Sequence, residues 1–522
     1  RKRKPGQKLN DDDDVTIDYI KRVLCRSWRT HSSPLSGISD EVESQPLETL
    51  LPPLTSSNEV DLQLYAFISA ILSHYVQSWY NRITPDQDFV AEVVQIIAHC
   101  TRELEQRLRH VDFESLLMEE LPGVLVEHMD AIRIAHKADD GSGSSRAIFC
   151  ALHHIEALSP IPDTSAHAMA QQENQSAWAQ LLVSRILPLV LPPEDLCNPC
   201  LHILVAEVLS EVVIHNVLFK KFIQPWLVWE AITKLVYTVR PELVPETAGK
   251  ERPIERKNLE NSGLLSSVYT KQPSRQSRPP TGMVDQTIRM IWWAVQAAML
   301  IWMVLRALTT ALLHPSSLPS RQSFRRDTAT MREHPVSVRS PGIDRIERPL
   351  IAMRIWTCIS HMVELDQRMP WLSGAGSLVQ WMVVHGPGRV CRADGIVDRL
   401  LSAQLQTHLL NPTRLPSLLH ATRAALFPAP YFFPAPARAS PDPSELPTLR
   451  RACADALLAA LPAGLKSMLF ATTDAAAARV DVENSLDRLF GDEHFNRHLV
   501  VRVVEAVAMR VFPELGMDDT WE

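Results

Sequence analysis

The sequence predicts an all-α protein made of several multi-helix bundles. Apolar residues recur at three- and four-residue spacing through most of the chain, which is the period of a helix with one buried face. No alternating strand of useful length appears, and the 38 Pro residues are bunched in a few stretches, which suits helices joined by Pro-rich connectors. Because 522 residues exceed what one core usually fills, we expect about two to four domains.

The charge and the cysteines narrow the class of protein. A formal charge of -7 argues against nucleic-acid binding, which normally needs a net basic face to displace counterions from phosphates. The eight Cys residues have no regular spacing, and no secretory signal is found, so reduced thiols in a cytosolic setting are expected. The chain begins at Arg1 and not at Met, which leaves open a membrane anchor in a missing upstream segment.

Residues 1–58 predict a charged tail, a short helix and a linker. The tail is basic up to Lys8 and acidic from Asp11 to Asp14. Over residues 15–28 the apolar positions alternate with basic ones at helical spacing, so this helix either lies on a membrane or docks on the protein body, with docking favoured. Residues 31–58 are rich in Ser and Pro and predict a linker.

Residues 59–240 predict the first helical domain. Its first helix begins near Glu59 and ends between Asn81 and Pro85, and a break near Pro225 is expected in its last helix. Between these, a flexible DDGSGSS loop is expected at 139–145. Two further helices are predicted from their apolar faces at Val90–Leu108 and Phe113–Met129. Two more are predicted over about 176–191 and 196–237.

The second half of the chain alternates linkers with helical regions. Three long, disordered linkers are predicted from composition. They are the polar, Pro- and Ser-rich residues 241–283, the basic residues 314–348 and the Pro-rich residues 427–443. Residues 349–426 predict a helical region, with helices at about 349–366, 374–384 and 394–410. Residues 444–517 predict a final helical domain, whose last helix ends at Phe512-Pro513-Glu514-Leu515 and carries one apolar face made of Leu499, Val500, Val503, Val504, Val507 and Val511.

Residues 284–313 form an unusually apolar, Trp-rich segment. Between Arg289 and Arg306 lie 16 residues whose only polar side chain is Gln296, fewer than the roughly 20 that a bilayer span needs. A helix that is apolar nearly all round is buried in a core, lies in a membrane interface or lines an apolar cavity, and a true span is the remaining alternative. The candidate lipid-contacting residues are Ile291, Trp292, Trp293, Val295, Ile301, Trp302 and Leu305, with Arg289 and Arg306 as candidate headgroup contacts.

Two blocks of the chain resemble a known pairing of domains. Residues 60–240 resemble the PX-associated (PXA) domain through FISAILSHYVQSWYNRITPDQDFVAEVVQIIAHCTRELEQRLRHVDFESLLMEELPGVLVEHM, with Trp79, Tyr80, Phe89, Asp112 and His128 in the expected places. Residues 441–516 resemble the sorting-nexin C-terminal (nexin-C) domain through LDRLFGDEHFNRHLVVRVVEAVAMRVFPEL.

The resemblance implies a sorting nexin of fungal type, reduced to these two domains. It implies that the two domains pack together around a long apolar cavity suited to lipid, in a protein of the endoplasmic reticulum, endosomes and organelle contacts. No PX domain, no RGS domain and no N-terminal transmembrane pair is found, so phosphoinositide reading and G-protein regulation are not carried over.

No catalytic motif is found, so an enzyme is not expected. Cys197 and Cys200 form a CxxC that lacks the second ligand pair of a zinc site, and ordinary packing is the preferred interpretation. His153-His154 lacks the i, i+4 spacing of a metalloprotease helix. The acidic pair Glu119-Glu120 is interpreted as two solvated carboxylates without a catalytic role. Neither a cofactor nor a metal is therefore predicted.

The predicted function is lipid binding or lipid transfer at the cytoplasmic face of endoplasmic reticulum or endosomal membranes. The physical argument is that helix surface in excess of what small domains bury faces something apolar, and acyl chains suit a long aliphatic lining. The expected partners are phospholipid or another membrane lipid and the membrane surface, with no nucleic acid. The alternative is a membrane-trafficking scaffold or tether, which binds protein partners through its helical faces.

Overall fold

Helices make up all the regular structure of the residues that the computed structural model describes, which confirms the predicted all-α fold. No strand occurs within these residues. They are 11–25, 46–84, 88–138, 145–243, 348–386, 395–408, 410–426, 444–461 and 474–516, with short pieces at 292, 295–296, 299, 302, 306, 393, 441, 466 and 468–470.

The N-terminal half contains one series of helices that runs from residue 11 to residue 243. Its first elements are α1 Asp11–Leu24, α4 Leu47–Leu50, α5 Asn58–Ile71, the π-helical turn η1 Leu72–Val76, α6 Gln77–Ile83 and α7 Asp88–Arg109. Next come α8 Phe113–Ser115, the π-helical turn η2 Leu116–Glu120, α9 Leu121–Ala138, α10 Ser145–Leu152 and the 3-10 turn η3 Glu156–Leu158. The series ends with α11 Ser165–Val190, α12 Pro193–Leu196, α13 Pro199–Glu207, the π-helical segment η4 Val208–Phe222, α14 Pro225–Val239 and the 3-10 turn η5 Pro241–Leu243.

Local patterns explain most of these helices. In α7 the buried residues are Val90, Val94 and Ala98, four apart on one face, as the periodicity predicts. The predicted break near Pro225 is confirmed, because η4 ends at Phe222 and Pro225 starts α14 at the position where its missing N–H costs nothing. The long helix α11 begins about eleven residues earlier than predicted, since its Ala- and Gln-rich first turns hold few large apolar residues that could mark a period.

The basic amphipathic helix α1 docks on the protein body, as favoured from its sequence. Tyr19, Ile20 and Val23 are buried in a core shared with α5, and the Gln77 side-chain amide donates to the Val23 carbonyl at 3.0 Å. The described end of the predicted 31–58 linker is also packed, because Leu54 is fully buried in the same core. Residues 31–45 of that linker lie outside the described residues, as do residues 26–30 before it and residues 139–144 of the loop predicted at 139–145.

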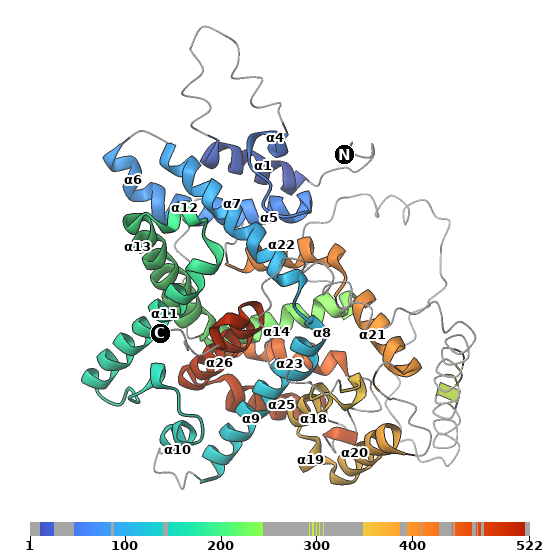
Figure 1. Ribbon diagram of the computed structural model, residues 1–522. Helices are drawn as coiled ribbons and strands as arrows, with labels where there is room; N and C mark the ends of the chain where they lie inside the picture. The colour runs from blue at the N-terminus through green and yellow to red at the C-terminus, as the bar shows by residue number, and fades with distance from the viewer. Residues whose placement is uncertain are drawn as a thin grey trace, which may run out of the picture.

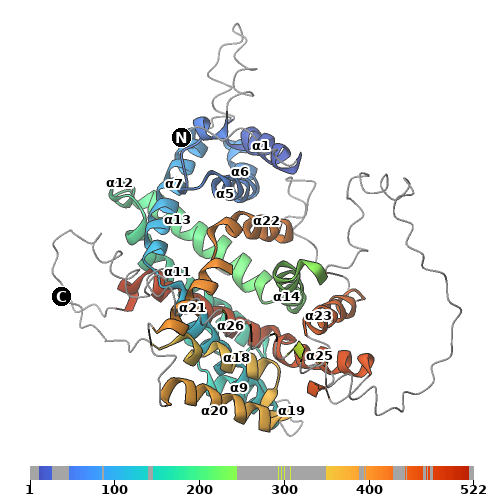
Figure 2. The same cartoon turned by 90° about the vertical axis from the view of Figure 1, so that its right-hand side faces the viewer.

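The C-terminal half contributes helices that pack into the N-terminal series. They are η7 Leu350–Ala352, α18 Ile355–Met362, α19 Leu365–Arg368, α20 Pro370–His385, α21 Ile396–His408, η8 Pro412–Arg414 and α22 Leu415–Leu426. After the predicted Pro-rich linker come α23 Leu446–Ala460, α25 Ala475–Phe490, α26 Glu493–Val511 and η9 Pro513–Gly516. Figures 1 and 2 show α22 beside α5, α23 beside α14, and α26 in the middle of the body.

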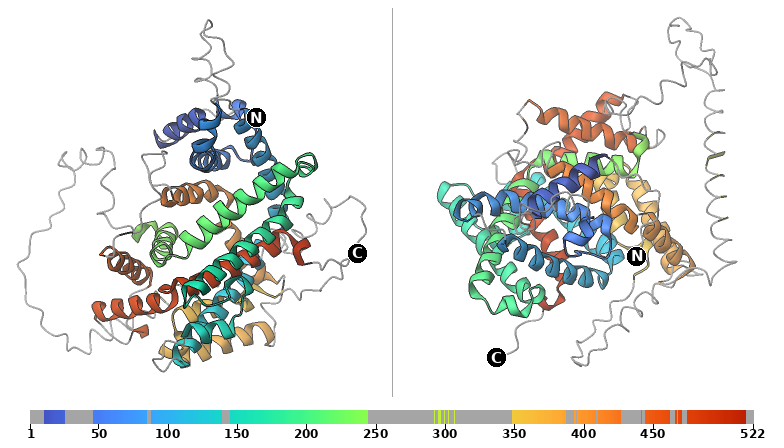
Figure 3. Two further views of the ribbon diagram at one scale, coloured as in Figure 1. Left: turned by 90° about the vertical axis from the view of Figure 1, so that its left-hand side faces the viewer. Right: turned by 90° about the horizontal axis from the view of Figure 1, so that it is seen from above.

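Helix α26 is the central element of this arrangement. It contacts α7, α9, η2 and η4, and Figure 3 shows it running alongside the N-terminal helices. Its buried residues, which include Phe495, Asn496 and Val501, point to several sides, whereas Val511 alone of the predicted apolar face is buried. A helix that is enclosed on several sides needs no single apolar stripe. The apolar periodicity of α26 therefore predicted only part of its buried surface.

Candidate functional site

The Trp-rich segment is exposed wherever its residues are described. Trp292, Val295, Met299 and Trp302 are helical and recur at spacings of three and four residues, so they share one helix face. Trp292 and Trp302 are 64% and 65% exposed. The basic residue at the end of the segment, Arg306, is also exposed. Ile291, Trp293, Ile301, Leu305 and Arg289 lie outside the described residues.

A second exposed apolar surface, which sequence reasoning did not select as a site, lies on helix α20. Its sequence PWLSGAGSLVQWMVVH contains no Asp, Glu, Lys or Arg, and none of its residues is buried. Trp371 and Trp381 are 64% and 61% exposed. We call the five exposed large side chains the α20 face, and they are Trp371, Leu378, Val379, Trp381 and Met382. The signal was present in the sequence as a 16-residue helix without ionised side chains, but burial in a core produces the same pattern.

Helix α20 is held at one end of the body by polar contacts. The Gln380 side-chain amide donates to the Ile351 carbonyl at 2.6 Å, which ties the middle of α20 to η7. The preceding helix α19 is fixed by Arg368, whose guanidinium bonds Glu364 at 2.9 Å and also pairs with Asp481 on α25. Figures 1 and 2 show α18, α19 and α20 together at the end of the body away from α1 and α5. The α20 face is therefore presented by a fixed helix.

One described helix is long and apolar enough to cross a membrane. It runs over α13 and η4, from Pro199 to Phe222, with a mean hydropathy of 1.6 and 19% of the window buried. Ile214 and Phe219 pack in a core with α11 and with Val501 of α26, whereas Ile203 is exposed. Length and composition do not distinguish such a helix from a core helix, and its contacts show that one face serves the core.

Acidic residues of the N-terminal series bind basic residues of the C-terminal half. Glu119 accepts from Arg348 at 2.8 Å and from the Arg354 backbone N–H at 2.8 Å. Glu120 accepts from the Arg510 Nε at 2.8 Å and from its Nη2. The interpretation of Glu119-Glu120 as a solvated pair is therefore wrong, because both carboxylates are bonded to arginines. These arginines lie more than 200 positions later in the sequence, so no local pattern reveals them.

Further polar contacts fix α26 along its length. The Arg502 guanidinium donates to Glu127 at 3.0 Å, and the Asn496 side-chain amide donates to the Ile223 carbonyl at 2.9 Å. The Trp178 indole N–H donates to Glu505 at 3.2 Å. These bonds and the apolar packing join the predicted N- and C-terminal blocks into one body.

The two pockets described beside α26 are small or polar. The larger, of about 470 Å³, is lined mainly by polar residues, among them Arg146, Asp492, Glu493, His494 and Arg497. The smaller, of about 10 Å³, lies among His128, Phe149, His153 and His498. Neither is a long apolar tunnel, so the lipid cavity that the resemblance implies stays a prediction.

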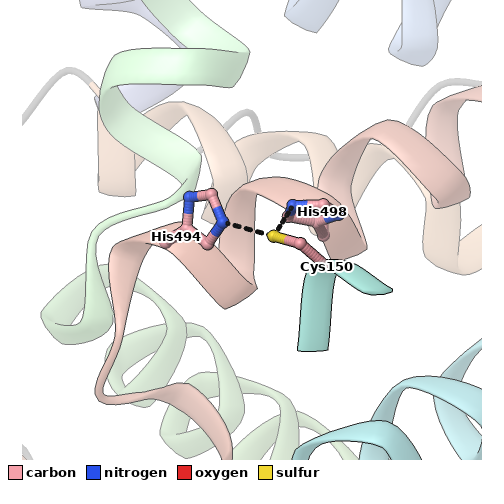
Figure 4. A group of neighbouring side chains, drawn as sticks. All are labelled: Cys150, His494 and His498. Atoms are coloured by element: carbon pink, nitrogen blue, oxygen red, sulfur yellow. Dashed lines mark hydrogen bonds between the residues drawn. The ribbon is translucent and has the colours of Figure 1, made fainter. Parts of the chain in front are cut away.

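Three potential metal ligands converge between α10 and α26. The Cys150 Sγ lies 3.2 Å from the His494 Nε2 and 3.8 Å from the His498 Nε2 (Figure 4). Sequence reasoning missed this group. The i, i+4 spacing of His494 and His498 was a usable signal, but Cys150 lies 344 positions before His494 and only the fold brings it near.

The CxxC and the His153-His154 pair, which the sequence analysis considered as metal sites, have structural roles. Cys197 and Cys200 are exposed, and Asn198 between them caps α13 by accepting from the Cys200 N–H at 3.1 Å. His153 lies at the edge of the core, where its Nε2 contacts the Glu127 carbonyl at 3.2 Å. The expected surface or core-edge role of His153 is confirmed.

Comparison with known proteins places a family domain on the N-terminal series. The PXA domain family matches residues 57–235. "PXA domain protein 1" of Schizosaccharomyces pombe is 30% identical over 158 residues, which cover 29% of this chain and 29% of that protein. Human "Sorting nexin-13" is 21% identical over 185 residues, covering 34% of this chain and 19% of that protein. "Sorting nexin-14" of Danio rerio is 24% identical over 154 residues, covering 29% of this chain and 16% of that protein.

No solved structure matches the chain. The chain spans less than a third of the length of these curated relatives. The family match ends at residue 235, so the nexin-C resemblance of residues 441–516 stays a prediction. Residues 57–235, which hold helices α5 to α14 of an all-α fold, therefore form a PXA domain, and this part of the chain is similar to proteins named as sorting nexins.

Proposed function

We propose that this protein binds membrane lipid at the cytoplasmic surface of endoplasmic reticulum or endosomal membranes, as part of membrane trafficking. The observation that carries the proposal is the α20 face, a fixed helix that exposes large apolar side chains and has no ionised ones. The names of the relatives, a PXA domain protein and two sorting nexins, support a trafficking context. The proposed role is binding and needs no catalytic group.

The physical chemistry of the α20 face favours a bilayer interface. Moving an ionised side chain out of water is costly, and this helix has none of the four residue types that would incur that cost. Trp371 and Trp381 lie ten residues apart, and Trp side chains prefer the boundary where one edge is apolar and the other is wet. Contiguous exposed apolar residues of this kind mark interaction sites on otherwise soluble surfaces.

The Trp-rich segment supplies a second candidate contact. Trp292 and Trp302 share one exposed helix face, with Arg306 beyond them as a candidate headgroup contact. Exposure of these Trp side chains is the arrangement that lipid contact requires, whereas a tightly enclosed core would have contradicted it. The full predicted set, Ile291 to Leu305 with Arg289, is part of this proposal. Transfer of lipid between membranes is proposed only as an extension of binding.

Vesicle flotation of the full chain tests the proposal. With phosphatidylcholine and phosphatidylserine vesicles, Trp371→Ser/Trp381→Ser should weaken partitioning by about tenfold or more, since about 1.4 kcal/mol is tenfold and partly burying one Trp contributes that order. The matched control Met169→Ser/Leu181→Ser removes two exposed apolar residues of α11 and should leave partitioning unchanged. Trp292→Ser/Trp302→Ser tests the Trp-rich segment in the same assay.

The outcomes separate lipid binding from the alternative. A wild-type chain that stays with the soluble fraction, or an α20 variant that floats like the control variant, contradicts lipid binding through this face. If the α20 variant instead loses a co-purifying protein while vesicle binding is absent throughout, the scaffold alternative is favoured. Native mass spectrometry of the purified chain then shows whether phospholipid remains bound inside it, as transfer would require.

A further inference from the structure

We infer that Cys150, His494 and His498 bind one Zn²⁺ ion, which cross-links helix α10 to the central helix α26. The ligand set is a thiol and two imidazoles, whose Sγ and ring nitrogens all lie within 4.8 Å of one another. Such a site goes beyond lipid binding, because it would hold the PXA segment to the C-terminal helix independently of any membrane. Figure 4 shows both imidazole rings directed toward the Cys150 sulfur.

The fold places these side chains by short-range and long-range constraints. His494 and His498 are four residues apart on α26 and therefore share one helix face. Asp492 caps the start of the helix, because its carboxylate accepts from the His494 N–H at 2.9 Å and thereby fixes the first turn. The Arg146 Nε on α10 lies 2.8 Å from the same carboxylate. This ion pair anchors the turn of α10 that precedes Cys150.

The other side of Cys150 is anchored by aromatic packing. Phe149 is fully buried, and its ring centroid lies 4.6 Å from that of Phe495 on α26. Arg146, one turn before Cys150, and Phe149, directly before it, are both held against α26, so the sulfur has little freedom to leave the two imidazoles. A preorganised ligand set binds a metal with less loss of conformational entropy than a mobile one.

The distances fit a tetrahedral zinc centre after small side-chain rotations. Zn–S and Zn–N bonds of about 2.3 and 2.1 Å place sulfur roughly 3.6 Å from each nitrogen and the two nitrogens roughly 3.4 Å apart. The observed sulfur to nitrogen distances, 3.2 and 3.8 Å, lie on either side of this value, and the two nitrogens lie within 4.8 Å of each other, so side-chain rotation has to bring them to about 3.4 Å. Both imidazoles use Nε2, so neither ring has to turn over to bind.

The thiol cannot satisfy both imidazoles by donating hydrogen bonds. A thiol has one hydrogen, so it cannot donate to two imidazole nitrogens at once. If both histidines instead donate from Nε2 to the sulfur, each Nδ1 becomes an acceptor, and neither Nδ1 has a hydrogen-bond partner among the described residues. His494 and His498 are only 4% and 2% exposed, so unmet polar atoms here are costly. A cation bound at this point takes the Nε2 lone pair of each histidine and one lone pair of the thiolate, and each Nδ1 then carries the ring proton.

The protonation states are compatible with binding of a divalent cation. Burial lowers the pKa of His494 to about 4 and of His498 to about 3, so both rings are neutral at physiological pH and can donate a lone pair. Burial raises the pKa of the Cys150 thiol to about 11, so the thiol gives up its proton to solvent as the Zn–S bond forms. Thiolate together with imidazole is a donor set that suits zinc.

We assign the fourth coordination position to a water molecule. His494 lines the 470 Å³ pocket at the start of α26, which opens a route for the ion and for a water molecule. Three protein ligands and one water complete a tetrahedron without a further protein group. The proposed ion is thus structural in effect, since it joins two helices, although it keeps one exchangeable position.

Metal analysis of the full chain with Zn²⁺ and Co²⁺ as probes tests the inference. The expected result is one Zn²⁺ per chain after dialysis, a higher Tm with Zn²⁺ than after chelation, and a thiolate-to-Co²⁺ charge-transfer band with Co²⁺. Cys150→Ser should abolish the band and weaken zinc binding by about 100-fold or more, because a thiolate ligand is lost. His498→Gln should likewise remove the zinc while keeping the shape of the side chain.

The double variant Cys197→Ser/Cys200→Ser is the matched control, because it removes two exposed thiols outside the group. It should retain one Zn²⁺ and the charge-transfer band. A wild-type chain without stoichiometric zinc overturns the inference. A band that survives Cys150→Ser but disappears in the control variant also overturns it, since the ion would then be bound at the CxxC.

Discussion

The ion pair between Glu120 and Arg510 provides a direct test of whether the PXA helices hold the central helix α26. Arg510 donates from two nitrogens to the Glu120 carboxylate, and its Nη2 also donates to the Ser115 hydroxyl at 3.0 Å. The two side chains are 22% and 25% exposed, so water screens the pair only partly. A double-mutant cycle with Glu120→Ala and Arg510→Ala isolates the coupling between them.

The expected magnitude lies between those of exposed and buried pairs. Exposed ion pairs contribute about 0.2–1 kcal/mol, and hydrogen bonds to charged groups contribute about 1.5–3 kcal/mol. For this two-point, partly exposed contact we expect a coupling of about 1–2 kcal/mol. Arg510→Ala alone should cost more, about 2–3 kcal/mol, because it also leaves Glu120 partly buried without its guanidinium partner.

Urea unfolding of the four chains of the cycle, followed by far-ultraviolet circular dichroism, gives the free energies. The control pair is Arg479 and Asp455, which join α25 to α23 at 2.6 Å but are 40% and 48% exposed, so their coupling should not exceed about 0.5 kcal/mol. Equal couplings for the two pairs would refute the reasoning. They would show that the contact between η2 and α26 contributes no more than a solvated surface pair.

Three further perturbations test the packing and electrostatics of the same body. Phe495→Ala removes a 1% exposed ring in contact with Phe149 and should cost about 3–5 kcal/mol in urea unfolding, and a loss below about 1 kcal/mol would contradict its core position. Asp61→Ala removes the acceptor of two backbone N–H groups at 2.7 and 3.2 Å and should cost about 2–3 kcal/mol, with faster proteolysis of residues 46–57 as a second readout. Burial raises the pKa of Glu505 above its usual value of 4.5, so the folded state favours the protonated form. The free-energy penalty of ionising Glu505 is therefore present at pH 7 and is relieved as the pH falls through the folded pKa. Glu505→Gln, which can still accept from Trp178, should therefore raise Tm at pH 7 and give a difference that shrinks toward pH 4.5, whereas a pH-independent difference would contradict this.

The helical elements and much of their order were predictable because the responsible signals are local. The face of α7, with Val90, Val94 and Ala98, repeats within a few turns, and Pro225 ends one helix and starts the next through its own covalent geometry. Where local signals were weak the prediction was less accurate, as at the Ala- and Gln-rich start of α11. The residues around Leu54 resembled a linker because their helix, α4, is short and their packing partners lie on other elements.

The candidate sites depended more strongly on the fold. The absence of ionised residues on α20 is written in the sequence, but whether such a helix is enclosed or exposed depends on what packs against it. The same holds for the Trp-rich segment, for which burial, a membrane interface and a cavity all remained open. Exposure of Trp292 and Trp302 favours the interpretations in which these side chains meet something outside the protein's own core.

By itself the sequence determined the helical class, the approximate helix limits and the PXA resemblance, since each rests on patterns within short stretches of chain. The tertiary structure alone decided which distant residues meet. Glu120 and Arg510 are separated by 390 positions, and Cys150 and His494 by 344. Periodicity fixes which way a side chain points from its own helix axis, but it carries no information about which other helix lies opposite. That choice follows from packing all the apolar faces together at once.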